Sequence, residues 1–157
     1  MKKIALFFAM LVAGINMSVQ AQTWEEMGTA LASVINTMTD EMTAAFASQG
    51  IPADAYATYN KPQKALDVVI DFGDLDIIPF LNDSILENTK NEFLSSFLES
   101  TLSDDPDGSN VSELVNVMGK DNGQIRIVLE AAGKKKAVGI NATDIRKAAK
   151  AQYGISL

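Results

Sequence analysis

The residues of this sequence that could do chemistry are aspartates in two short stretches. Two carboxyl groups held about 5–9.5 Å apart across a cleft are the machinery of a glycosidase, so a carboxylate-dependent hydrolase is one hypothesis. Aspartate and glycine also end strands and form turns, which is the simpler role that we expect for both stretches. The stretches are DFGDLD, with Asp71, Asp74 and Asp76, and SDDPDG, with Asp104, Asp105 and Asp107.

Other catalytic machinery is restricted by composition, because the chain contains neither histidine nor cysteine. The Ser-His-Asp triad, the Cys-His dyad and the ordinary zinc sites all need one of these residues. A GxxxxGK[ST] phosphate-binding loop is also absent from the sequence. We therefore expect no bound cofactor and favour a protein that is not an enzyme.

The acidic loop 103–109 has a partial likeness to a calcium-binding loop. With Gly108 at the invariant sixth position of an EF-hand loop, Leu114 falls at position twelve, where a bidentate glutamate is required. Pro106 at position four is a second departure from the pattern. We expect a turn that caps the following helix, and a weak calcium site of another kind is the alternative.

The first 21 residues have the features of a cleaved signal peptide. Lys2 and Lys3 precede an apolar run from Ile4 to Ile15, and Val19-Gln20-Ala21 fits the small-residue cleavage pattern. The run is too short to cross a bilayer, which takes about 20 apolar residues. We predict cleavage before Gln22, no stable membrane anchoring afterwards, and one globular domain over residues 22–157. The short basic start and the lack of cysteine favour a bacterial protein that is periplasmic or secreted.

Charge is distributed unevenly along the chain. Without Lys2 and Lys3 the chain keeps 11 basic and 20 acidic side chains, a net charge of −9, yet residues 134–157 alone sum to +5. Such a domain would repel the phosphate backbone of nucleic acid, so we exclude that partner. The basic residues at the C-terminal end could meet an anionic partner, although charge runs more often mark solvated faces.

The candidate interaction surface combines these basic residues with two tyrosines. Tyr56 and Tyr59 fall three apart in DAYATYNKP, which has no regular period and is expected to be a loop that could offer a contact patch. Trp24 lies on an apolar helix stripe and is expected in the core. The basic members of the surface are Lys134, Lys135, Lys136, Arg146, Lys147 and Lys150.

Hydrophobic periodicity and capping boxes predict four helices. Thr23 with Glu26 opens a long helix that ends near Gln49, before Gly50 and Pro52, and its methionines are expected in the core. Ser84 with Glu87 opens a second helix, which runs to about Thr101. A short helix begins at Asn110 with Glu113, and a last one begins at Thr143 and Asp144.

Alternation of apolar residues predicts three strands. They cover about Ala65 to Phe72, Gln124 to Ala132 and Ala137 to Ile140, with the last two joined as a hairpin around Gly133. We expect an α+β fold in the order α-β-α-α-β-β-α, with a small antiparallel or mixed three-stranded sheet covered by amphipathic helices.

The sequence therefore favours an exported, non-enzymatic interaction module. Its partner would be another envelope or extracellular protein, or a second copy of the chain. A binder of a small apolar or peptide ligand is the alternative, and the carboxylate hydrolase is the second alternative. An interaction module predicts an exposed apolar strip, a ligand binder predicts an enclosed cavity, and an enzyme predicts acidic groups with displaced pKa values.

Overall fold

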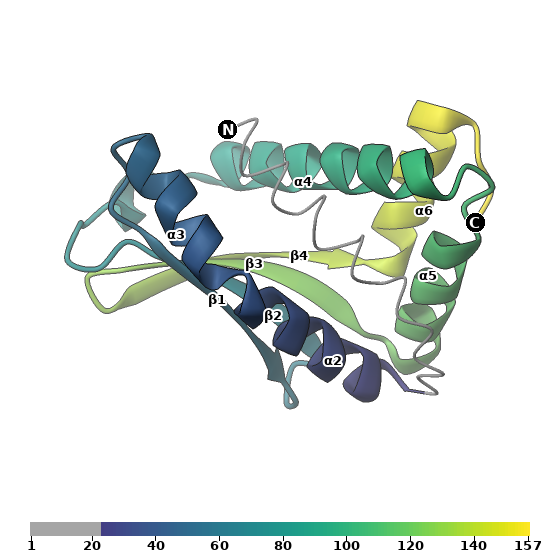
Figure 1. Ribbon diagram of the computed structural model, residues 1–157, viewed down its shortest axis with the longest axis horizontal. Helices are drawn as coiled ribbons and strands as arrows, with labels where there is room; N and C mark the ends of the chain where they lie inside the picture. Colours follow the sequence, from purple (N-terminus) through teal and green to yellow (C-terminus); the bar gives the residue numbers. More distant parts are fainter. Residues whose placement is uncertain (1–22) are drawn as a thin grey trace.

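The computed structural model describes residues 23–157 and confirms the α+β class. Helices and strands alternate in pairs along the chain, in the order α-α-β-β-α-α-β-β-α (Figure 1). The elements are α2 (Trp24–Thr37), α3 (Thr39–Ser48), β1 (Asp54–Asn60), β2 (Ala65–Asp71), the 3-10 turn η2 (Ile78–Phe80), α4 (Asp83–Asp104), α5 (Ser109–Asp121), β3 (Gln124–Ala131), β4 (Lys134–Asn141) and α6 (Ala142–Tyr153).

The sheet has four strands in the order β1-β2-β3-β4, so the expected three-stranded sheet was wrong. Two antiparallel hairpins, β1–β2 and β3–β4, are joined by parallel pairing of β2 with β3. The parallel pair is possible because η2, α4 and α5 carry the chain back between β2 and β3.

The strand that the sequence did not predict is β1, which occupies the segment expected to be a loop. Its side chains alternate, with Ala55 and Ala57 buried and Asp54, Tyr56 and Thr58 exposed. Alanine is only weakly hydrophobic, so the alternation of buried and exposed residues in β1 is hard to recognise from the sequence.

The helices of residues 23–157 pack on one face of the sheet, which we call the inner face. The strand members of the hydrophobic core cluster come from that face, for example Leu66 and Val68 of β2 and Ile127 of β3. Figure 1 shows α2 and α3 over the β1–β2 half of the sheet, whereas α4 and α6 lie towards β4. The opposite, outer face carries mostly polar side chains within the described residues.

The first helix is broken, although a single long helix was expected. α2 ends at Thr37 and α3 begins at Thr39, with Met38 between them. The hydroxyls of both threonines donate to carbonyls three residues back, Val34 and Asn36. Such bonds compete with the helical ladder and bend helices, so the break gives the two halves separate directions over β1.

Helix starts agree with the expected capping in part. The Thr23–Glu26 capping box is present, whereas α4 is capped by Asn82 and α6 by a box of Asn141 with Asp144. The N-cap of α5 is Gly108, two residues before the expected cap Asn110, and the Asp105 carboxylate accepts from the N–H of Asn110.

Trp24 is fully buried, as expected, and lies where the two hairpins meet. Its indole Nε1–H donates to the carbonyl of Lys64 at 2.9 Å, and its backbone N–H donates to the Asp121 carboxylate at 2.7 Å. Gly123 faces the indole ring so closely that a Cβ there would collide with it. The start of the described chain is therefore fixed against residues far along the sequence.

The predicted signal peptide lies outside the described residues. Within residues 23–157 no helix has the length and apolar character needed to cross a membrane.

Candidate functional site

The structure separates the basic residues of the candidate interaction surface into two groups. Lys134, Lys135 and Lys136 begin β4, directly after the hairpin turn, while Arg146 and its neighbours Lys147 and Lys150 lie on α6, which follows the far end of β4. At about 3.4 Å per residue, β4 puts roughly 23 Å between its two ends. The cations therefore do not form one basic face.

The two tyrosines are also separated, because they lie on opposite faces of β1. Tyr56 is on the outer face with 41% of its surface exposed. Tyr59 points to the inner face and packs against the core, where its ring lies so close to Gly28 of α2 that a Cβ there would collide with it. Only Tyr56 is therefore available for a surface contact.

The exposed large apolar side chains concentrate between β2 and the first turn of α4. Phe80 is 76% exposed, Leu75 46% and Ile85 39%. We call residues 75–85 the apolar segment. Within the described residues, the other exposed large apolar side chains are Tyr56 and Tyr153.

The apolar segment is held firmly against the turn of the β3–β4 hairpin. The Ala132 N–H donates to the carbonyl of Gly73 at 2.6 Å, and Lys134 Nζ lies 3.4 Å from an Asp76 carboxylate oxygen. Lys136 Nζ donates to the carbonyl of Leu81. Exposure of Phe80 is therefore a property of an ordered segment with fixed ends.

The interior of the segment is tied to the core as well. Ile78 of η2 is buried, and Leu81 packs partly against the core cluster. Two local backbone hydrogen bonds stabilise its turns: the Ile77 N–H donates to the Leu75 carbonyl at 2.9 Å, and the Phe80 N–H donates to the Ile77 carbonyl at 3.0 Å. These contacts leave Phe80 pointing away from the core.

Lys134 and Lys136 thus border an apolar surface that sequence reasoning missed, whereas Lys135 lies on the outer face of the sheet opposite Glu130. The segment DLDIIPFLND has neither helical nor strand periodicity, so its apolar residues were not assigned to a face. A signal was present: Ile77, Ile78, Phe80 and Leu81 cluster around Pro79, in a stretch that could not be a regular core element.

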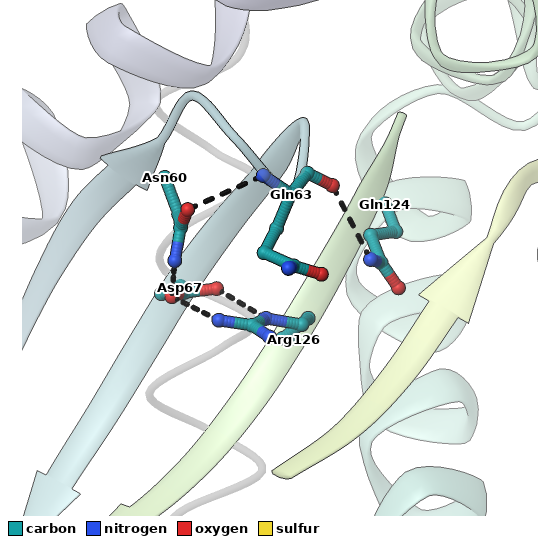
Figure 2. Close-up of polar contacts among 5 residues, drawn as sticks. All are labelled: Asn60, Gln63, Asp67, Gln124 and Arg126. Atoms are coloured by element: carbon teal, nitrogen blue, oxygen red, sulfur yellow. Dashed lines mark hydrogen bonds and ion pairs between the residues drawn. The ribbon is translucent and has the colours of Figure 1, made fainter. Parts of the chain in front are cut away.

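A second polar feature lies on the outer face of the sheet, where Asp67 faces Arg126 across β2 and β3 (Figure 2). The guanidinium donates from Nε to one carboxylate oxygen at 2.7 Å and from Nη2 to the other at 2.6 Å. Asn60 adds a bond to Asp67 at 3.1 Å, and Gln63 joins Asn60 to Gln124.

This outer-face network is satisfied internally. Asp67 is 5% exposed, and within the described residues no buried side-chain nitrogen or oxygen lacks a hydrogen-bond partner. The bond to the Asp67 carboxylate raises the pKa of Arg126 above its ordinary value. The network fastens the two hairpins together, and the charges of Asp67 and Arg126 at its centre neutralise each other.

The acidic stretches also have structural roles. The Asp71 carboxylate accepts from the N–H of Gly73, and Asp76 pairs with Lys134. Asp105 caps α5, and the N–H of Ser109 holds the pKa of Asp107 below its ordinary value. Within the described residues, no group of three or more acidic side chains is arranged to hold a metal ion.

The fold and the exposed segment together define an α+β protein with helices on one face of a mixed sheet and an apolar surface at one end of it. Comparison of the chain with known protein families, curated proteins and solved structures gives no match.

Proposed function

We propose that this protein is an exported, non-enzymatic interaction module that binds a partner protein through the apolar segment. The observation that carries the proposal is Phe80, which is 76% exposed in a segment anchored at both ends. An exposed aromatic side chain on a rigid support is typical of an interface anchor, because little conformational entropy is lost when it is buried.

The surroundings of Phe80 fit a protein partner. Leu75 and Ile85 widen the apolar surface, while Lys134 and Asp83 at its border are charged. An apolar centre with a polar rim is the usual anatomy of a protein interface. Because Lys134 is positive and Asp83 is negative, the charges around the apolar surface could orient either a foreign partner or a second copy of the chain.

The geometry lends no support to the hydrolase alternative. Four of the six candidate aspartates have structural roles: Asp71 and Asp107 accept bonds in turns, Asp105 accepts at the start of α5, and Asp76 pairs with Lys134. The pKa of Asp107 is lowered, and the pKa values of Arg126 and of the three tyrosines are raised. Each shift moves the group further from titration near neutral pH, where a general acid or base must work.

Site-specific photocrosslinking in the host tests the interaction surface. A photoreactive phenylalanine analogue at position 80 should give a discrete adduct, and its mass identifies either a partner or a dimer of this chain. Tyr153 on α6 is a matched control, because it is also aromatic and 42% exposed but lies on another element. The Phe80→Asp variant should lose binding to the partner identified, whereas Tyr153→Asp should keep it.

Equal labelling at positions 80 and 153, or no adduct at position 80, would overturn the proposed surface. Export is a separate part of the proposal and has its own measurement. The intact mass of protein recovered from the envelope fraction should correspond to residues 22–157, and a mass that includes residues 1–21 would contradict cleavage before Gln22.

A further inference from the structure

The two edge strands of the sheet differ in whether their backbone is available. In the β3–β4 hairpin, Ala132 and Gly133 both have positive φ, 49° and 72°, which is the two-residue type I′ turn. That turn makes Ala131 and Lys134 a hydrogen-bonded pair. Along β4 the backbone groups therefore point alternately to β3 and away from it, and those that point away begin with Lys135. The outward-pointing residues are Lys135, Ala137, Gly139 and Asn141.

Most of the backbone groups on this edge have no hydrogen-bond partner among the described residues. The N–H of Asn141 is taken by the Asp144 carboxylate in the cap of α6. The N–H and C=O groups of Lys135, Ala137 and Gly139 have no hydrogen-bond partner within residues 23–157. Spaced two residues apart, they form the pattern that an added strand would complete.

The opposite edge of the sheet is closed by a side chain. The Asn36 carboxamide of α2 donates to the carbonyl of Ala57 at 2.8 Å and accepts from its N–H, also at 2.8 Å. Ala57 lies in the middle of β1, so the amide takes the position of a peptide group in a neighbouring strand. The backbone of Ala57 in the β1 edge is thus paired with a side chain of α2, whereas Lys135, Ala137 and Gly139 in the β4 edge keep unpaired backbone groups within residues 23–157, although α4 packs beside β4.

The side chains along the β4 edge restrict what could bind there. Lys135 is exposed, and although Glu130 lies opposite it on β3, the Glu130 carboxylate hydrogen-bonds to Tyr56 and makes no ion pair with Lys135 within the described residues. Ala137 and Gly139 are too small to obstruct a second strand. Val138 on the inner face is half-buried and would gain an apolar neighbour. The edge therefore suits an extended segment with an acidic residue near Lys135 and an apolar residue near Val138.

A second copy of this chain fits less well than a foreign segment. Antiparallel pairing of two β4 strands about Ala137 would place Lys135 opposite Gly139 of the second copy, which offers no acidic group. A lysine on an edge strand discourages pairing with neutral or basic strands, including a second β4, whereas an acidic segment would offset its charge. Charge complementarity therefore favours an acidic partner.

From this asymmetry we infer that β4 binds an extended, acidic peptide segment of another protein by strand addition. This inference goes beyond the proposed function, because it rests on backbone groups of β4 and not on the apolar segment. Backbone bonds would give affinity, and Lys135 would select for acidic side chains.

Amide hydrogen exchange with a synthetic peptide that alternates glutamate and valine tests the inference on the wild-type protein. The peptide should protect the amides of Lys135, Ala137 and Gly139, and a lysine–valine peptide of equal length should protect them far less. Absence of protection on β4, or equal protection by both peptides, would overturn the inference.

Two variants separate backbone recognition from charge recognition. Ala137→Pro removes an N–H directed to the free edge without breaking the β3 ladder, and proline is tolerated on edge strands; it should weaken binding of the peptide at least about tenfold. Ala137→Val keeps the N–H and should bind normally, while Lys135→Glu should weaken binding about three- to tenfold. Unchanged affinity in Ala137→Pro would contradict strand addition, whereas Phe80→Asp should leave peptide binding unchanged.

Discussion

Asp67 and Arg126 lie directly opposite each other on parallel neighbouring strands and are joined by two hydrogen bonds of 2.7 and 2.6 Å. Each residue belongs to a different hairpin, so this ion pair bridges the junction at which the two halves of the sheet meet. The Asp67 side chain is 8% exposed and that of Arg126 is 22% exposed, so water screens the pair only weakly.

Replacing Arg126 with methionine should destabilise the protein by about 2–4 kcal/mol, because the carboxylate of Asp67 would be left buried without its countercharge. Urea unfolding followed by circular dichroism measures this change. Replacing both residues, Asp67→Val with Arg126→Met, should recover most of the loss, since no buried charge then remains. A double variant that is less stable than Arg126→Met would contradict this account.

Replacing Asn36 with alanine should open the β1 edge. The variant would lose about 1–2 kcal/mol of stability, because the N–H and C=O of Ala57 lose their partners. It should also self-associate more readily, since an unprotected edge can pair with another chain. Light scattering against concentration measures the association, and Ser33→Ala on the exposed side of α2 is the control that should remain unchanged.

Replacing Gly123 with alanine should be strongly destabilising, by about 2–4 kcal/mol, because the new Cβ would collide with the indole of Trp24. Gly50→Ala is the comparison, since a Cβ there meets nothing within 4 Å and the substitution carries only the strain of a positive φ of 72°, about 1 kcal/mol. Thermal unfolding measured by tryptophan fluorescence should rank the two variants in this order. Equal losses would mean that packing against Trp24 contributes little.

Replacing Glu130 with glutamine should lower the pKa of Tyr56. Burial, followed by the charge of Glu130, raises the pKa of the Tyr56 hydroxyl above its ordinary value, and Glu130 also hydrogen-bonds to it. Carbon-13 NMR of labelled tyrosine rings follows the titration of each tyrosine separately. Tyr153, whose pKa is raised by burial and by Glu99, serves as the internal reference and should not respond.

The raised tyrosine pKa values also set the alkaline limit of stability. Below a pH of about 10 the tyrosines are neutral in both folded and unfolded chains. As the pH rises further, the unfolded chain releases these protons first, so the free energy of unfolding falls until the folded tyrosines titrate as well. Urea midpoints should therefore decrease above pH 10, and an increase would contradict the direction of these shifts.

The sequence patterns predicted the elements whose hydrophobic contrast is strong. β2 and β3 alternate large aliphatic residues with polar ones, and both were found close to the expected bounds. The hairpin partner β4 was also expected, but it begins at Lys134, three residues before the predicted start at Ala137. The first capping box, the burial of Trp24 and the end of α3 before Gly50 were also confirmed.

The missed elements follow from weak contrast and from long-range contacts. β1 buries alanines, and its edge is completed by Asn36, which no local pattern reveals. The break at Met38 depends on threonine hydroxyls that a periodicity analysis treats as neutral. Parallel pairing of β2 with β3 could not be predicted, because it depends on how the intervening helices return the chain.

The candidate surface was predicted only in part. The lysines at the start of β4 were singled out by their charge, but their neighbours Leu75 and Phe80 were not, because exposure is a tertiary property. The cations of α6 were grouped with those lysines only because they are near in sequence, and the length of β4 separates them in space.

The parallel junction between β2 and β3 has a consequence for the order of folding. Each hairpin can close locally, but residues 72–123 must be synthesised before β2 finds its second neighbour. Contacts of such high sequence separation slow folding, because the entropy of closing the loop is lost before the contacts are gained. A nascent chain that has emerged only as far as α5 lacks β3 and β4, so we expect the sheet to form fully only after residues 124–157 leave the ribosome.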